Sequence, residues 1–273
     1  YKEAEQSLQR TKTILKILQK TDVVDAGALG FVLLIQGVLN SIQKGSKIQS
    51  THLDISYKLE NVEALKKVGV KSLTIVVGFK SNKILQEIKD IQADDFVNFI
   101  HNDRFDRGSI VSLWCAREKL SSGYQILFMD ADVLYHASLI EKLTSESVHS
   151  IIPYDRVFEA GDEPVKICLS NEKPVEFSKK VSCKYDQIGE WPGFMRLSPK
   201  SAKLIADDLD AGIVNGDLDS PYEDSMRRVI LGSSNDEFEF IDITGLPWIE
   251  IDFPKDLEKA KSIILPKIDD FLG

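Results

Sequence analysis

The sequence predicts an α/β protein with a mostly parallel mixed sheet that has helices on both faces. From Tyr57 onward, amphipathic helical segments alternate with short apolar runs. The runs at 73–77 and 125–129 are continuous enough to be strands buried on both faces. Such an alternation gives a largely parallel sheet, and ligands bind such sheets at the carboxyl ends of the strands. The residues that follow strands are therefore the first candidates for a site.

The individual elements follow from hydrophobic periodicity and from turn residues. Strands are predicted over 73–77, 96–100, 125–129, 150–153, 194–197, 238–243 and 248–251. Helices are predicted over 58–68, 82–91, 109–119, 139–143, 199–209, 222–230 and from Pro254 onward. Two runs at 165–169 and 174–177, around Asn171, read as a hairpin.

Composition excludes several classes of protein. Of the 273 residues, 43% are apolar and 28% are charged, which is typical of a globular chain and not of a disordered one. The net charge of −9 argues against a nucleic-acid partner. The apolar stretch 26–39 is shorter than the roughly 20 residues of a membrane span. Three scattered cysteines without a CxxC argue against a disulfide framework or structural zinc, and we expect a cytoplasmic location.

We expect three parts along the chain. Residues 1–45 are predicted to be helical, residues 46–56 form a polar linker, and residues 57–273 form the main domain. The chain begins with Tyr1 rather than Met, so we expect it to be a fragment or a processed product.

Two acidic positions follow predicted strands. The strand at 125–129 runs into Asp130-Ala131-Asp132, and a period of two would place both carboxylates on the same side. Two negative charges at such a short distance repel each other, which favours a divalent cation between them. In proteins this cation is typically Mg²⁺ together with substrate phosphates. The alternative is that these acids only open the turn before the next helix. Asp252, at the end of the strand at 248–251, is either a second ligand for the same metal or the cap of the helix at Pro254.

Eight segments of the sequence, taken in order, resemble nucleotidyltransferases of the sugar-phosphate and phosphocholine or phosphonate cytidylyltransferase type. The resemblance covers most of residues 57–265. The matching segments are NVEALKKVGV (61–70), TIVVGFKSNKI (74–84), NDRFDRGSIVSLWCAREKL (102–120), LFMDADVLYHASLIEKL (127–143), VKICLSNEKPVEFSKKV (165–181), GEWPGFMRLSP (189–199), YEDSMRRVI (222–230) and WIEIDFPKDLEKA (248–260).

The resemblance implies a metal site for Mg²⁺ and a nucleotide site. Asp132 matches the metal-binding aspartate after the central strand, with Asp130 as its neighbour, and Asp252 matches the second metal ligand. Gly108 and Ser109 occupy the place where the backbone of the family meets the nucleobase.

The resemblance also implies an acceptor site and phosphate contacts. Gly193 matches the glycine that lets the backbone approach the acceptor, with Glu190 nearby, and Glu223 and Asp224 fall where the acceptor pocket is lined. Lys166 and Lys179 are candidate phosphate contacts; alternatively, they are two lysines on a solvated hairpin.

One part of the family pattern is absent from the sequence. The family begins with a strand and a loop of the form AAGxGxR that cradles the triphosphate, and no such loop precedes Tyr57. Residues 22–42 instead resemble the end of a dihydroxyacetone-kinase-like domain, or form a glycine-spaced packing helix. Either a larger protein was cut, or segments are missing from the sequence, or the catalytic fold has degenerated.

The resemblance predicts a Mg²⁺-dependent enzyme that joins the nucleoside monophosphate of an NTP, with CTP favoured, to a phosphorylated or phosphonate small molecule and releases pyrophosphate. The acids Glu190, Glu223 and Asp224 favour an acceptor with a cationic head, such as phosphocholine or aminoethylphosphonate. A non-catalytic relative that acts as a binding or interaction module is the alternative, which the missing loop favours. A glycosyltransferase of related fold is a second alternative.

Overall fold

The computed structural model describes residues 62, 64–234 and 237–271. The chain divides into two compact units. Within the described residues, the larger unit comprises the stretch up to Asp130 and Ala137–Leu246, and the smaller comprises Ala131–His136 and the stretch from Pro247 onward. The predicted helical segment 1–45, the linker 46–56 and the place of the missing loop lie outside the described residues.

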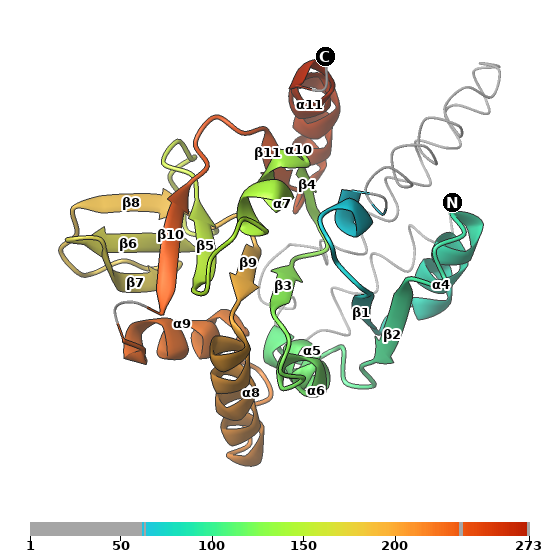
Figure 1. Ribbon diagram of the computed structural model, residues 1–273, viewed down its shortest axis with the longest axis horizontal. Helices are drawn as coiled ribbons and strands as arrows, with labels where there is room; N and C mark the ends of the chain where they lie inside the picture. The colour runs from blue at the N-terminus through green and yellow to red at the C-terminus, as the bar shows by residue number, and fades with distance from the viewer. Residues whose placement is uncertain (1–61, 63, 235–236, 272–273) are drawn as a thin grey trace. The chain divides into compact units, whose positions relative to one another are not determined.

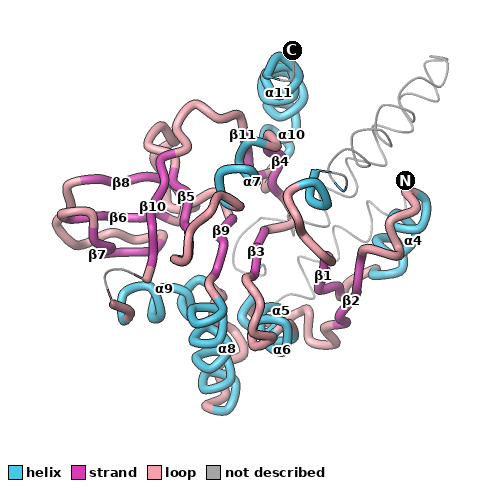
Figure 2. The backbone as a smooth tube through the Cα atoms, in the orientation of Figure 1, coloured by secondary structure: helices cyan, strands magenta, loops and turns pink. Residues whose placement is uncertain are grey.

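Helices and strands alternate along the first part of the larger unit, and five strands in succession, β5 to β9, precede helices α8 and α9 (Figures 1 and 2). Its strands are β1 (Leu73–Val77), β2 (Val97–His101), β3 (Ile126–Met129), β5 (Ser150–Tyr154), β6 (Lys166–Ser170), β7 (Lys173–Ser178), β8 (Gln187–Glu190), β9 (Phe194–Leu197) and β10 (Phe238–Asp242). Its helices are α4 (Ser81–Asp90), α5 (Ser109–Cys115), α6 (Arg117–Leu120), α7 (Ser138–Leu143), α8 (Pro199–Val214) and α9 (Glu223–Gly232).

The strands of the larger unit form a mixed arrangement of sheets. β1 and β2 are parallel, and a four-stranded sheet has the order β10-β5-β9-β3. In that sheet β10 and β5 are parallel, whereas β9 is antiparallel to both of its neighbours. The predicted α/β class with a mixed sheet is confirmed. The strand at 194–197 was predicted, but its antiparallel direction was not, because β9 enters the sheet from β8 and not from a crossover helix.

A third sheet of the larger unit contains the predicted hairpin. Its order is β7-β6-β8, with both pairings antiparallel (Figure 1). The turn between β6 and β7 consists of Asn171 and Glu172, both with positive φ angles (49° and 62°). Two residues with positive φ form the type of turn that matches the twist of a hairpin, and Asn tolerates this conformation well. The hairpin around Asn171 is therefore confirmed.

The hydrophobic core of the larger unit lies between the sheets and helices α5, α8 and α9. Helix α8 contributes Ala202, Ile205, Ala206 and Leu209, which are buried at the three- and four-residue spacing of one helical face. Fully buried residues of this core also include Ile110, Ile152, Met195 and Leu197.

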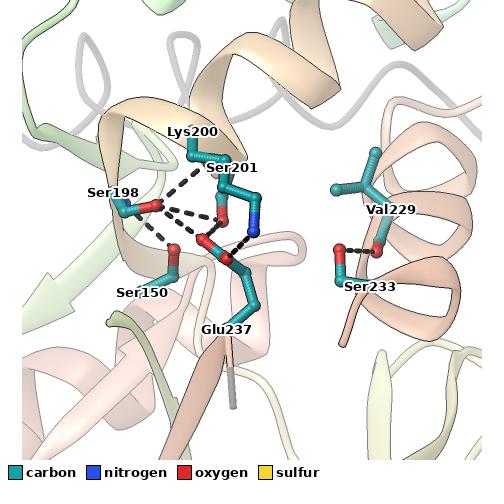
Figure 3. A network of polar contacts seen from close by, with 7 residues as sticks. All are labelled: Ser150, Ser198, Lys200, Ser201, Val229, Ser233 and Glu237. Carbon is teal, nitrogen blue, oxygen red and sulfur yellow. Dashed lines mark hydrogen bonds and ion pairs between the residues drawn. The ribbon is translucent and has the colours of Figure 1, made fainter. Parts of the chain in front are cut away.

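A polar network fixes the start of α8. Ser198 is the N-cap residue, its side chain accepts a hydrogen bond from Ser201 N, and Pro199 is the first helical residue. The hydroxyls of Ser198 and Ser201 both donate to Glu237 Oε1 at 2.9 Å, and Lys200 Nζ lies 2.5 Å from Glu237 Oε2 (Figure 3). Ser198 N in turn donates to Ser150 Oγ at 2.9 Å. This network ties α8 to β5 and to the segment before β10.

The described part of the smaller unit is a two-stranded sheet followed by a helical tail. β4 (Val133–Tyr135) and β11 (Trp248–Glu250) pair antiparallel, with Trp248 opposite Tyr135. The tail consists of α10 (Pro254–Lys259), a π-helical turn (Ala260–Ile264) and α11 (Leu265–Phe271). Pro254 is the first helical residue, as predicted. None of the helices in the described ranges is both long enough and apolar enough to cross a membrane.

Candidate functional site

Three carboxylates gather where β4 and β11 of the smaller unit meet. Asp132 directly precedes β4, Glu250 ends β11, and Asp252 follows two residues after Glu250. Glu250 lies opposite Val133 in the register, and Ile251 N donates to the carbonyl of Asp132 at 2.9 Å. One carboxylate oxygen from each acid lies within 4.8 Å of the others. The antiparallel pairing therefore brings together three acids that come from two distant stretches of the chain.

The chain beyond Asp252 is held by the start of α10. Phe253 N donates to Asp256 Oδ2 at 2.8 Å, and Pro254 begins the helix. Helix α10 therefore fixes the backbone directly after the acid cluster, through the side chain of Asp256. The N-cap position of α10 is occupied by Phe253 and not by Asp252.

The chemistry of this donor set suits a hard divalent cation. Asp132 and Glu250 are exposed and Asp252 is half-buried. Although Asp132 is accessible as a residue, desolvation of its carboxyl group by the surrounding protein raises its pKa above the ordinary value. Opposite ligands of Mg²⁺ are about 4.2 Å apart, and the three carboxylate oxygens lie no more than 4.8 Å from one another, which is close to that separation. The residues present fit Mg²⁺.

Asp130 lies in the larger unit and contacts a different set of residues. β3 ends at Met129 and residues 131–132 form a bend. No strand connects Asp130 with Asp132, so the strand period of two that predicted both carboxylates on the same side does not apply to them. The carboxylate of Asp130 accepts hydrogen bonds from the hydroxyl of Tyr222, at 2.8 Å to Oδ1 and 2.6 Å to Oδ2. Asp130 N donates to Gly193 O at 2.9 Å.

An aromatic cluster surrounds the ring of Tyr222. The ring lies 5.3 Å from that of Phe128 and 6.4 Å from that of Trp191, measured between centroids. Trp191 also packs against Phe177 at 5.2 Å, and its indole N–H donates to Phe194 O at 2.6 Å. Trp191 and Phe177 are buried in the hydrophobic core, so this cluster holds the ring of Tyr222 in place.

The predicted acceptor acids are spread over two elements of the larger unit. Glu223 and Asp224 lie in the first turn of α9, and Glu190 ends β8. Burial raises the pKa of Glu223, while the positive charge of Lys179 acts in the opposite direction. Glu223 Oε2 is shielded from solvent and has no hydrogen-bond partner among the described residues. A buried carboxylate oxygen without a donor is costly, so this atom is suited to a ligand that brings one.

Gly108 and Ser109, the predicted nucleobase contacts, are engaged by the segment that leads into α9. Gly108 N donates to Leu218 O at 2.8 Å, and a Cβ at Gly108 would lie 2.4 Å from the Asp219 carbonyl carbon. Ser109 Oγ accepts a hydrogen bond from Tyr222 N at 3.0 Å. Glycine is thus required at 108 by the close approach of this segment.

The two predicted phosphate lysines differ in their surroundings. Lys166 Nζ donates to three backbone carbonyls, those of Gly161, Pro164 and Lys179, at 2.8–3.0 Å. An ammonium group has three donor hydrogens, so Lys166 is occupied in holding the ends of this loop. Lys179 forms an exposed ion pair with Glu163 at 3.2 Å and acts electrostatically on Glu223.

Sequence reasoning missed Glu250 and Tyr222. Glu250 stands two residues before Asp252, and that spacing on a strand places both on one side, so a signal was present. Tyr222 carried no such signal, because only the fold brings its hydroxyl to a residue 92 positions earlier.

No protein-family model and no curated protein matches the sequence. Solved structures do match its fold. The inositol-1-phosphate CTP transferase of T. maritima superposes with a TM-score of 0.59 and 17% identity, over 78% of this chain and 82% of that one. The CTP:phosphocholine cytidylyltransferase of Streptococcus pneumoniae gives 0.57 and 18%, over 75% and 83%. UDP-glucose pyrophosphorylase complexed with UDP-glucose gives 0.58 and 13%, over 77% and 86%. The chain therefore has the fold of nucleotidyltransferases.

Proposed function

We propose that the chain is a Mg²⁺-dependent nucleotidyltransferase that transfers a nucleoside monophosphate from CTP to a phosphorylated or phosphonate small molecule. A shared fold does not by itself fix a function, so the proposal depends on the site. The observation that carries it is the acid cluster of Asp132, Glu250 and Asp252, which provides a hard-cation donor set on this fold.

The three acids would hold Mg²⁺ between them. At a separation of 4 Å, two like charges near a protein surface repel by about 4 kcal/mol, so the cluster favours a cation. When bound, the cation would supply charge neutralisation for the phosphate groups of the nucleotide. The protein would position the reacting groups, and positioning is the main contribution of a protein to transfer at phosphorus.

The transfer itself needs no covalent intermediate with the protein. A phosphate or phosphonate oxygen of the acceptor forms a bond to the α-phosphorus of the nucleotide. The bond from that phosphorus to its bridging oxygen breaks, and pyrophosphate leaves with the electron pair. Gly108 and Ser109 remain the predicted nucleobase contacts, and CTP is favoured because two of the similar structures are CTP-dependent by name.

The acceptor that fits the larger unit has a cationic head. Glu223 and Asp224 supply negative charge at the start of α9, with Glu223 Oε2 lacking a donor in the described part of the chain. Tyr222 directly precedes Glu223 in the sequence, and its ring packs against the rings of Trp191 and Phe128. Phosphocholine, which the S. pneumoniae enzyme takes by name, and aminoethylphosphonate both carry such a head. The scattered cysteines fit a reducing, cytoplasmic setting for this reaction.

A non-catalytic relative that binds nucleotide is the second candidate. The observation that favours it is the absence from the sequence of the glycine-rich loop that cradles a triphosphate. Backbone N–H groups in such loops are preorganised anion contacts, and side chains elsewhere replace them poorly. We therefore expect weak CTP binding and slow turnover from the chain as given.

Pyrophosphate release tests the proposal and separates the candidates. The chain is incubated with Mg²⁺ and CTP, together with phosphocholine, aminoethylphosphonate, inositol 1-phosphate or glucose 1-phosphate. Release that requires an acceptor and stops on chelation of the metal supports the proposal. The Asp252→Asn variant should lose this release, whereas Glu258→Gln, which removes an exposed acid of α10 outside the cluster, should keep it. No release with any acceptor or nucleotide would favour the binding module.

A further inference from the structure

Asp130 joins three elements that carry the predicted acceptor residues. It stands at the end of β3, its backbone N–H extends the pairing with β9 by donating to Gly193 O at 2.9 Å, and its carboxylate receives the Tyr222 hydroxyl. Tyr222 is the residue directly before Glu223 at the start of α9. A single residue therefore binds the glycine loop before β9 through its backbone N–H, and the residue that precedes the acceptor acids through its carboxylate.

The contact between Asp130 and Gly193 leaves no space for a larger residue. Gly193 has a φ of +79°, which L side chains rarely adopt. A Cβ built at this position would lie 2.6 Å from Asp130 Oδ2 and 3.0 Å from Asp130 Cβ. The glycine is therefore required by the position of Asp130 as well as by its own backbone conformation.

The ring of Tyr222 is held independently of its hydroxyl group. Phe128 and Trp191 pack against the ring, and Tyr222 N donates to Ser109 Oγ at 3.0 Å. The preceding segment is bound through the two-point ion pair of Arg107 with Asp219, at 2.6 and 2.7 Å. Removal of the hydroxyl alone should thus leave the ring in place and cut only the link to Asp130.

We infer that Asp130 is a positioning residue for the acceptor side of the reaction and is not a metal ligand. Its backbone N–H binds Gly193 and its carboxylate accepts the Tyr222 hydroxyl, so Asp130 fixes the Gly193 loop and the start of α9 relative to each other. Glu223 directly follows Tyr222 in the sequence, so the hydrogen bond between Tyr222 and Asp130 also positions Glu223. The inference rests on the proposed function for its kinetic consequences, while the link itself is a property of the larger unit.

The test combines Tyr222→Phe, Asp130→Asn and the double variant. A hydrogen bond to a charged group is worth enough to change an equilibrium about 10-fold, so each single variant should raise the KM of the acceptor by about that factor. The kcat should stay within about 3-fold, because the interaction is made equally in the ground and transition states. The double variant should be no worse than either single one. Tyr124→Phe, which alters a tyrosine that is 76% exposed, is the matched control and should behave as wild type.

Two further measurements separate this inference from the proposed function. Calorimetric titration with Mn²⁺, as a probe of the metal site, should give the same affinity for Asp130→Asn as for wild type; a large loss would mean that Asp130 is a ligand and would overturn the inference. Urea unfolding of the same four proteins should show coupling between Asp130 and Tyr222, whether or not pyrophosphate is released. Strictly additive effects on unfolding would contradict the link even if the enzyme proved active.

Discussion

Glu237 and Glu223, two glutamates of the larger unit, differ in whether the protein supplies hydrogen-bond donors to both oxygens of the carboxylate. Glu237, beside the start of α8, accepts hydrogen bonds from Ser198 and Ser201 and pairs with Lys200 (Figure 3). Burial acts to raise its pKa, but these three donors outweigh burial and hold the pKa below its usual value. Glu223, in the first turn of α9, has an oxygen with no donor in the described ranges, and burial raises its pKa.

The difference separates a carboxylate that stabilises the fold from one that is available to a ligand. The protein supplies both oxygens of Glu237 with donors, so this group has its full set of interactions before any ligand arrives. Glu223 is desolvated without equal compensation, which costs stability and is typical of binding sites. We therefore assign Glu237 to stability and Glu223 to acceptor binding, and the two glutamates should respond differently to the same kinds of change.

The largest effect should come from Glu237→Ala. The substitution leaves the hydroxyls of Ser198 and Ser201 without their acceptor and Lys200 without its ion pair, so it should lower the free energy of unfolding by about 3 kcal/mol. Urea unfolding measures this change, with Glu118→Ala, an exposed acid of α6, as control at about 0.5 kcal/mol or less. Equal losses for the two variants would show that the network contributes nothing.

Glu223→Gln should reverse the pattern. The substitution removes a desolvated charge and keeps the size of the side chain, so the free energy of unfolding should be equal to or higher than that of wild type near neutral pH. The KM for a cationic acceptor should rise by at least about 10-fold, because a charge-assisted interaction is lost. Pyrophosphate release against acceptor concentration measures it. A destabilisation as large as that of Glu237→Ala would remove the distinction between the two glutamates.

The smallest effect is the opposite pH dependence of the two groups. The pKa of Glu237 is lowered on folding, so its stabilisation is present above the unfolded pKa, about 4.3, and is lost as the pH falls through the folded value. The pKa of Glu223 is raised, so its protonated form is favoured in the folded state and its cost appears as the pH rises through the folded value.

Unfolding of the Gln variants between pH 3 and 7 measures both dependences. The stability gap between wild type and Glu237→Gln should narrow toward low pH. For Glu223, the free energy of unfolding of the wild type should instead rise toward low pH relative to that of the Glu223→Gln variant. Gaps that move in the same direction for both variants would contradict the assigned pKa shifts.

Much of the fold was predictable because its central strands are uninterrupted apolar runs. The strands β1 and β3, the hairpin around Asn171 and the helix start at Pro254 all carry local signals in the sequence. β4 and β8 carry none, since one has three residues and the other contains a single large apolar side chain. Their places are set by pairing with distant strands.

The candidate site was predictable only in part, for a related physical reason. Asp132 and Asp252 follow strand signals, so the sequence could point to them as partners on one cation. The hydrogen bonds of Asp130, Gly108 and Lys166 depend on residues that pack against them only after folding. The sequence shows which side chains could bind a ligand, whereas the tertiary fold decides whether they bind a ligand or another residue of the protein.

The proposed metal-dependent transfer is tested most directly by Asp132→Ala. Pyrophosphate release from CTP and phosphocholine or aminoethylphosphonate is measured with Mg²⁺, alongside thermal unfolding of both proteins. Wild type should release pyrophosphate, and the variant should lose this activity because several kcal/mol of charge stabilisation disappear with the metal. Its free energy of unfolding should change by no more than about 0.5 kcal/mol, since the residue is exposed. Unchanged turnover in a folded variant would contradict the assignment of Asp132 to the metal site.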